Sequence, residues 1–140
     1  MASLIGFYSL IFGLCFSFLI ILLSIKNLKN KDIFDKRIIF STFLQFLFVL
    51  VSFLGLIFSF VNSDFSNETV FNHSHTTKPL FYKISGTWGN HEGSLLLWLL
   101  VLTLFIFIFL LKSKEQNKEY KIFTLLFQQI IIIGFFIFII

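Results

Sequence analysis

One polar stretch of this sequence holds most of the side chains that could do chemistry. It reads GTWGNHEGSLLLW over residues 86–98 and stands directly before a long apolar run. An imidazole can move a proton or bind a metal, and an indole above an apolar wall can receive a planar amphipathic ligand. The candidate site residues are therefore Trp88, His91, Glu92, Ser94 and Trp98. The pattern assigns no catalytic step to any of them.

The spacing within this stretch predicts the start of a helix. Asn90 is a good N-cap, and a carboxylate at Glu92 favours the positive helix end. Such a helix would carry one shared face made of His91, Ser94, Leu95 and Trp98. Tight turns and close backbone approach are allowed by Gly86, Gly89 and Gly93. A ligand-binding surface and an interfacial helix anchor both remain open as interpretations.

The other two histidines do not predict a metal centre. His73 and His75 form the motif HSH in the polar segment that precedes the candidate site. No cysteine or further histidine beside them supplies the remaining ligands of a closed site. We expect a solvated loop there and no metal ion.

The composition predicts a membrane protein. Of 140 residues, 57% are hydrophobic and only 13% are charged, which is too little charge to cover a soluble domain. Four apolar runs are long enough to cross a bilayer, and lipid leaves helices as the only suitable backbone structure. We predict a single all-α integral membrane domain over residues 1–140, with helices at about 4–25, 38–61, 94–111 and 122–140 and a polar loop at 62–93.

Basic residues predict the orientation of these spans. The segment joining the first two spans carries five Lys and Arg residues, and the segment joining the last two carries four. The polar loop carries only Lys78 and Lys83. By the positive-inside rule, both termini and the polar loop face the outer side, which is the periplasm or the intermembrane space. This asymmetry accounts for the net charge of +4, so no nucleic-acid partner is expected.

Small and polar residues recur along the spans with helical spacing. The sets are Gly6, Gly13, Ser17 and Ser24; then Thr42, Gln45, Ser52, Gly55 and Ser59; then Gln128 and Gln129. Buried amides in lipid need partners, so protein must cover these faces, either from the same chain or from another one. No predicted span contains Asp, Glu, Lys, Arg or His, which disfavours a channel or a proton-coupled carrier.

Codon usage is reflected in the choice of hydrophobic residues. The chain has 23 Phe but only 7 Gly and one Pro, and its loops are rich in Lys and Asn. Phe, Ile, Lys and Asn have A/T-rich codons. We therefore predict an A/T-rich gene, which suggests an organellar genome or an A/T-rich bacterium.

Residues 82–98, YKISGTWGNHEGSLLLW, resemble a signature segment near the N-terminus of CcmF-type haem lyases, which belong to the cytochrome c maturation system. The matching positions are Trp88, Gly89, His91, Glu92, Gly93, Ser94, Leu95, Leu96, Leu97 and Trp98. The resemblance implies a protein that receives haem from a haem chaperone and helps to attach it covalently to apocytochrome c on the outer face. It also makes the five candidate site residues haem-handling candidates.

The resemblance further implies what this sequence lacks. Family members are several times longer, and their tryptophan-rich haem-handling segment and its flanking histidines lie further along the chain. Trp88 and Trp98 are the only tryptophans here. We therefore expect the N-terminal part of a split, mitochondrially encoded haem lyase, inactive alone and working with the other fragments. The resemblance implies a location in the mitochondrial inner membrane, with a bacterial inner membrane as the alternative. The alternative is a structural membrane subunit of a mitochondrial respiratory-chain complex. The uncharged spans, and their polar faces that require cover by protein, would suit such a subunit.

Overall fold

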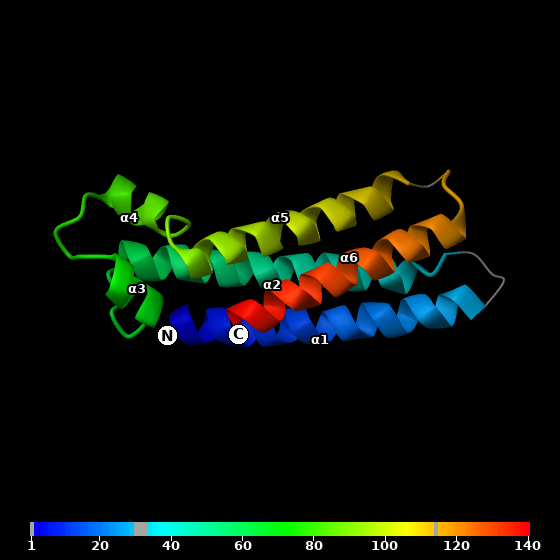
Figure 1. Cartoon of the computed structure of the whole chain (residues 1–140), viewed down its shortest axis with the longest axis horizontal. Coiled ribbons are helices and arrows are strands. Elements are labelled where there is room, and N and C mark those ends of the chain that lie inside the picture. Colours follow the sequence, from blue (N-terminus) through cyan, green and yellow to red (C-terminus); the bar gives the residue numbers. More distant parts are fainter. Residues whose placement is uncertain (1, 30–33, 114) are drawn as a thin grey trace.

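The chain folds as a bundle of four long helices with two short helices at one end (Figure 1). This computed structural model describes residues 2–29, 34–113 and 115–140. The long helices are α1 (Ala2–Lys29), α2 (Lys36–Val61), α5 (His91–Lys112) and α6 (Lys118–Ile139). All four have the length and apolar composition needed to cross a membrane, which confirms the predicted all-α fold with four candidate spans.

The helices extend beyond the apolar runs that predicted them. The structure carries α1 on to Lys29 and starts α6 at Lys118, whereas the apolar runs end near residue 25 and begin near residue 122. Polar residues at helix ends can lie outside the hydrocarbon, so a helix need not end where its apolar run ends. The segment predicted as a polar loop also contains two short helices, α3 (Glu68–His73) and α4 (Leu80–Gly86).

Helix α6 closes the bundle. It packs against both α1 and α5, while α2 packs against the same two helices (Figure 1). The buried core is built from aliphatic and aromatic side chains of all four long helices, among them Ile20, Val49, Leu99, Ile132 and Phe136. The outward-facing residues are largely apolar as well, including Phe105, Phe127 and Phe138, as lipid contact requires.

Small residues allow α1 to approach its neighbours closely. A Cβ atom added at Gly13 would lie 2.9 Å from Cζ of Phe136 in α6, so the phenyl ring fills the space that the glycine leaves. A Cβ atom at Gly6 would lie 3.5 Å from the backbone oxygen of Ser52 in α2. The small-residue face predicted in the first span therefore packs within this chain.

A pair of glutamine side chains joins α2 to α6 in the middle of the bundle. Gln45 Nε2 donates to Gln129 Oε1 at 3.1 Å, and Gln129 Nε2 donates back to Gln45 Oε1 at 3.0 Å. Gln45 Nε2 also lies 2.6 Å from Ser17 Oγ of α1. All three side chains are fully buried. Of the two interpretations left open for these amides, partners within the same chain are the ones the structure shows.

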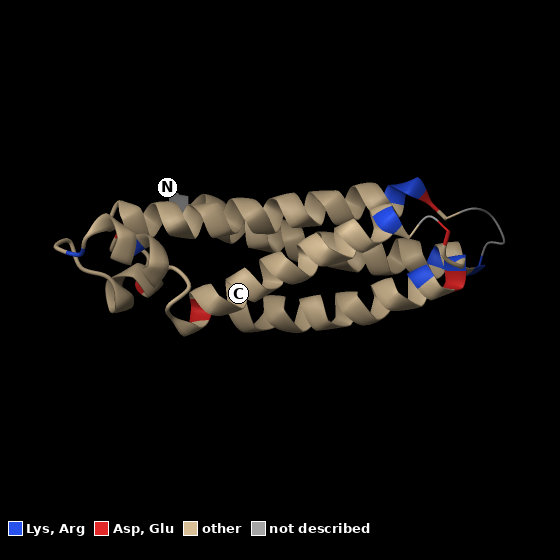
Figure 2. Ribbon diagram, turned by 90° about the horizontal axis from the view of Figure 1, so that it is seen from above, with Lys and Arg blue, Asp and Glu red and all other residues tan. Residues whose placement is uncertain are grey.

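Charge separates the two ends of the bundle. Figure 2 shows Lys and Arg gathered mainly where α1 connects to α2 and α5 connects to α6. The opposite end, hereafter the α3 end, carries α3, α4, the start of α1 and the last turn of α6 (Figure 1). The two termini and the polar segment thus share one end, as the distribution of basic residues predicts.

Candidate functional site

The end of α2 holds the segment that leads into the candidate site. Helix α2 is followed by Ser63, whose φ of 53° lies in the left-handed region. Lys83 Nζ of α4 donates to Ser63 Oγ at 2.7 Å. A Cβ atom at Gly86 would lie 3.5 Å from the Phe60 ring, which is fully buried. These contacts fix α4 on α2 and so set the starting point of the turn into α5.

A partly exposed carboxyl lies in the turn between α2 and α3. Ser66 Oγ donates to Asp64 Oδ1 at 2.6 Å, and the backbone N–H of Ser66 donates to the same oxygen at 3.2 Å. These two donors, the hydroxyl first, lower the pKa of Asp64 because they favour its charged form. The turn is thereby ordered beside α3.

Asn90 organises the turn into α5, and its predicted role as N-cap is confirmed. Its Oδ1 atom accepts a hydrogen bond from the backbone N–H of Gly93 at 2.7 Å. Its Nδ2 group donates to the carbonyl oxygens of Gly86 at 2.9 Å and Thr87 at 3.2 Å. Asn90 is only 7% exposed, so one buried amide connects the end of α4 to the first turn of α5.

Replacing Asn90 with alanine is expected to lower the free energy of unfolding by about 1–2 kcal/mol, since it removes both the cap and the two donated bonds. Thermal or denaturant unfolding of the purified chain in detergent would measure the change. Asn117→Ala is the matched control, because the cap of α6 is exposed and its bond to Glu119 N is long at 3.4 Å. Equal effects of the two substitutions would contradict the special role of Asn90.

Of the three glycines in the motif, Gly93 is the one that a close backbone approach requires. A Cβ atom at Gly93 would overlap the carbonyl oxygen of Thr87, which is itself fully buried. By contrast, a Cβ atom at Gly89 would lie 3.4 Å from the nearest atom, the carbonyl oxygen of Ser85. The turn therefore folds back directly over the first turn of α5, and only glycine leaves enough room there.

The predicted site residues divide between two sides of α5. His91 and Trp98 are exposed and lie along one outward strip with Leu95, as their helical spacing requires. The Ser94 hydroxyl lies 2.9 Å from the carbonyl oxygen of His91, so the helix backbone already occupies it. Glu92 is exposed on another side, at the rim of a cavity at the α3 end. Trp88 is partly exposed in the turn before α5.

One residue of the outward strip, Leu95, borders an open groove. Leu95 lines an apolar groove of about 290 Å³ together with Ile131, Gly134, Phe135 and Phe138. Haem needs an axial ligand and apolar contacts on both faces. His91 lies four positions before Leu95, so it stands about one helical turn from the groove on the same strip. Within the described ranges no group of three or more His, Cys, Asp or Glu residues could hold a metal ion.

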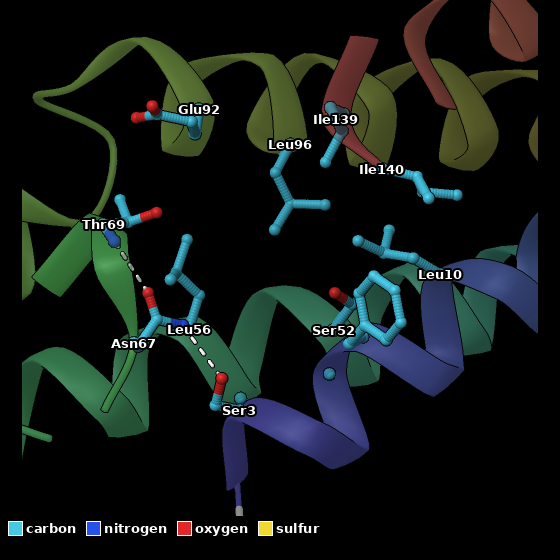
Figure 3. A pocket seen from close by; sticks show the side chains of 13 residues that line it. Ser3, Leu10, Ser52, Leu56, Asn67, Thr69, Glu92, Leu96, Ile139 and Ile140 are labelled. Atoms are coloured by element: carbon cyan, nitrogen blue, oxygen red, sulfur yellow. Dashed lines mark hydrogen bonds between the residues drawn. The ribbon is translucent and has the colours of Figure 1, made fainter. Parts of the chain in front are cut away.

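Sequence reasoning missed the cavity beside Glu92 (Figure 3). It has a volume of about 260 Å³ and lies between α1, α2, α3, α5 and the last turn of α6. Its lining mixes apolar side chains with the polar residues Ser3, Ser52, Asn67, Thr69 and Glu92. Only Glu92 belonged to the predicted site. Ser52 belongs to the polar face that was predicted in the second span. Nothing in the sequence predicted that α3 would lie over that face and border the cavity.

Comparison with known proteins gives a consistent answer. No family model matches the chain. It is 43% identical over 98 residues to the cytochrome c-type biogenesis protein CycK of Bradyrhizobium diazoefficiens, which covers 69% of this chain and 15% of that protein. It is 33% identical over 123 residues to CcmF of Escherichia coli, covering 85% of this chain and 19% of that protein. A solved structure, cytochrome c haem lyase CcmF, matches 97% of this chain with a TM-score of 0.83 and 27% identity.

This chain is a homologue of CcmF-type cytochrome c biogenesis proteins. The resemblance first suggested by residues 82–98 is thus confirmed over almost the whole chain. The CcmF homologue spans less than a fifth of the length of these two curated relatives and 23% of the solved chain. These likenesses favour cytochrome c biogenesis over the respiratory-chain alternative.

Proposed function

We propose that this chain supplies the first membrane section of a CcmF-type haem lyase, which attaches haem covalently to apocytochrome c. The observation that carries this proposal is the match to the solved CcmF haem lyase, which extends over all four long helices. The chain provides the scaffold, the outward strip that presents His91 and Trp98, and the turn that carries Trp88. Other fragments of the lyase, a haem chaperone and apocytochrome c are its partners, and haem attachment requires the whole assembly.

Three points support dependence on further sections of the lyase. The relatives are several times longer than the section that matches. Leu95, on the same strip of α5 as His91, lines a groove that is open to the surroundings of the bundle. The aromatic residues on the outer faces of α5 and α6, including Phe105 and Phe138, are exposed and suited to contact with lipid or further helices. We infer that further sections of the lyase complete the site.

Affinity purification in mild detergent, followed by mass spectrometry, tests the proposed assembly. We expect other cytochrome c maturation proteins to co-purify with a tagged chain. Depleting the chain should reduce haem staining of c-type cytochromes without reducing the apocytochromes themselves. Recovery of respiratory-complex subunits together with normal haem staining would contradict the proposal and support the alternative.

We also propose that the α3 end faces the outer side of a mitochondrial inner membrane, or of a bacterial inner membrane as the alternative. The gathering of Lys and Arg at the opposite end supports the orientation. The excess of residues with A/T-rich codons supports a mitochondrial gene. In a Cys15→Ser background, cysteines are introduced one at a time at the exposed positions Thr77 and Gln116. A membrane-impermeant maleimide should label Thr77→Cys in intact mitoplasts, and Gln116→Cys only after permeabilisation. The reverse pattern would contradict this orientation.

His91→Ala is expected to lower the yield of holocytochrome c about tenfold, the loss typical when a group that supports a metal centre is removed. Insertion into the membrane should be unchanged because His91 is exposed at the start of α5. Haem staining and carbonate-resistant membrane recovery measure the two effects. His75→Ala is the control, since His75 is exposed at the same end of the bundle but outside the motif. A normal yield from His91→Ala would leave the residue without a role in haem handling.

A further inference from the structure

We propose that the cavity at the α3 end binds one amphipathic lipid whose head group is a primary ammonium. The cavity is separate from the outward strip at His91, and its occupation does not depend on the proposed role in haem attachment. Figure 3 shows a space bordered by α1, α2, α3 and α5, with Ile139 and Ile140 of the α6 end beside Leu10.

The walls of the cavity suit a hydrocarbon chain. Apolar side chains reach it from four helices, namely Phe7, Leu10, Leu56, Leu96 and Ile139. Leu10 and Leu96 are themselves buried, so the inner part of the space is continuous with the core. Its volume of about 260 Å³ is close to the lower limit for pockets that bind small ligands. One alkyl segment suits this space better than a large planar ring system.

Four of the five polar residues of the cavity, Ser3, Asn67, Thr69 and Glu92, lie on the side nearest α3 (Figure 3). Asn67 Nδ2 donates to Ser3 Oγ at 3.2 Å, and Asn67 Oδ1 accepts from the backbone N–H of Thr69 at 3.0 Å. Asn67 is therefore occupied in holding the rim together. Deeper inside, Ser52 adds a hydroxyl from α2. This arrangement places polar groups where a lipid head would meet water and apolar groups where its chain would lie.

Glu92 selects the head group. Across residues 2–29, 34–113 and 115–140, no ion pair or hydrogen bond joins the Glu92 side chain to another residue. A carboxylate offers only acceptors, so it favours a positive group that carries N–H donors. A primary ammonium provides both the charge and the donors. A quaternary ammonium provides the charge but no N–H donor. A glycerol head provides no cation, so the repulsion between the Glu92 carboxylate and the lipid phosphate is not offset.

Native mass spectrometry of the purified 140-residue chain tests the proposal. The probes are lysophosphatidylethanolamine, lysophosphatidylcholine and lysophosphatidylglycerol with the same acyl chain. We expect one lysophosphatidylethanolamine per chain, bound about three- to fivefold more tightly than the other two, because the rim is exposed to water and its charge interactions are screened. Glu92→Gln should remove this preference while leaving the chain folded. Equal binding of the three lipids by the natural chain would overturn the proposal.

A second pair of variants tests the location. Leu56→Trp would fill the cavity and should weaken binding of all three lipids at least about tenfold. Leu54→Trp places the same side chain on the exposed face of the same helix and should change nothing. Circular dichroism verifies that each variant is folded. If Leu56→Trp does not fold, the Glu92→Gln variant still tests the proposal. Binding that survives in a folded Leu56→Trp variant would place the lipid elsewhere and overturn the proposal.

The occupant could instead be protein. A photo-reactive amino acid at position 56 in the membrane-embedded assembly distinguishes the two cases. Cross-linking to phospholipid supports the proposal. Efficient cross-linking to another polypeptide would overturn it, because the cavity would then be a contact site for that protein.

Discussion

Replacing Gly93 with alanine is expected to disrupt the junction between α4 and α5 and to lower the free energy of unfolding by about 1–3 kcal/mol, as overpacking of a tight interior does. The added methyl group would overlap the carbonyl oxygen of Thr87 and lie 2.8 Å from the carbonyl carbon of the same residue. The first obstacle is backbone, so no flexible side chain can move aside. Denaturant unfolding monitored by circular dichroism measures the loss in stability.

The effect should extend to function because the same turn positions the outward strip of α5. Under the proposed role, Gly93→Ala should also reduce the yield of holocytochrome c. Gly134→Ala is the matched control: nothing lies within 4 Å of a Cβ atom at that position, and alanine favours a helix. This control should be neutral or slightly stabilising. Wild-type stability of Gly93→Ala would contradict the close approach of the turn to α5.

Removing one member of the central glutamine pair is expected to lower the free energy of unfolding. Gln45→Leu leaves Gln129 buried in an apolar interior without its two reciprocal bonds. We expect a loss of about 1–2 kcal/mol in the free energy of unfolding, and Gln129→Leu should cost a similar amount. Unfolding in mixed micelles, followed by circular dichroism, provides the comparison.

The double variant separates hydrogen bonding from packing. Gln45→Leu combined with Gln129→Leu removes both partners and replaces them with apolar groups of similar size, so most of the lost stability should return. Ser17 keeps its own bond to the carbonyl oxygen of Gly13 at 3.4 Å. Gln128→Leu, at the half-buried neighbouring position, is the control and should have little effect. Simple addition of the two single losses would contradict a coupled pair.

Much of the fold follows from sequence because the bilayer allows few structures. Long apolar runs can cross it only as helices, and their connections carry the charge that separates the two ends of the bundle. Asn90 could be assigned as an N-cap because capping depends on local backbone geometry. Hydrogen-bond partners on other helices cannot be predicted in the same way. The buried Gln45 amide requires a partner, but spacing along one helix does not show that this partner is Gln129, 84 positions later.

The candidate site was predictable only in part. Helical spacing is enough to place His91, Leu95 and Trp98 on one strip. It is not enough to show that Glu92 meets α3, because that depends on how residues 62–90 fold back over the bundle. The short helices α3 and α4 have little amphipathic pattern, and tertiary contacts such as Lys83 to Ser63 hold them in place. The cavity was therefore beyond any argument from local sequence.

The position of α6 has a consequence for how the chain is made. Helices α1 and α2 emerge first, and Gln45 can already bond to Ser17 within that hairpin. Its second bond must wait until residue 129 has been synthesised and α6 has entered between α1 and α5. Among these four spans, the one that closes the bundle therefore follows the other three in order of synthesis. Until α6 arrives, Oε1 of Gln45 lacks the donor that Gln129 supplies, and this unmet hydrogen bond favours docking of the helix that carries Gln129.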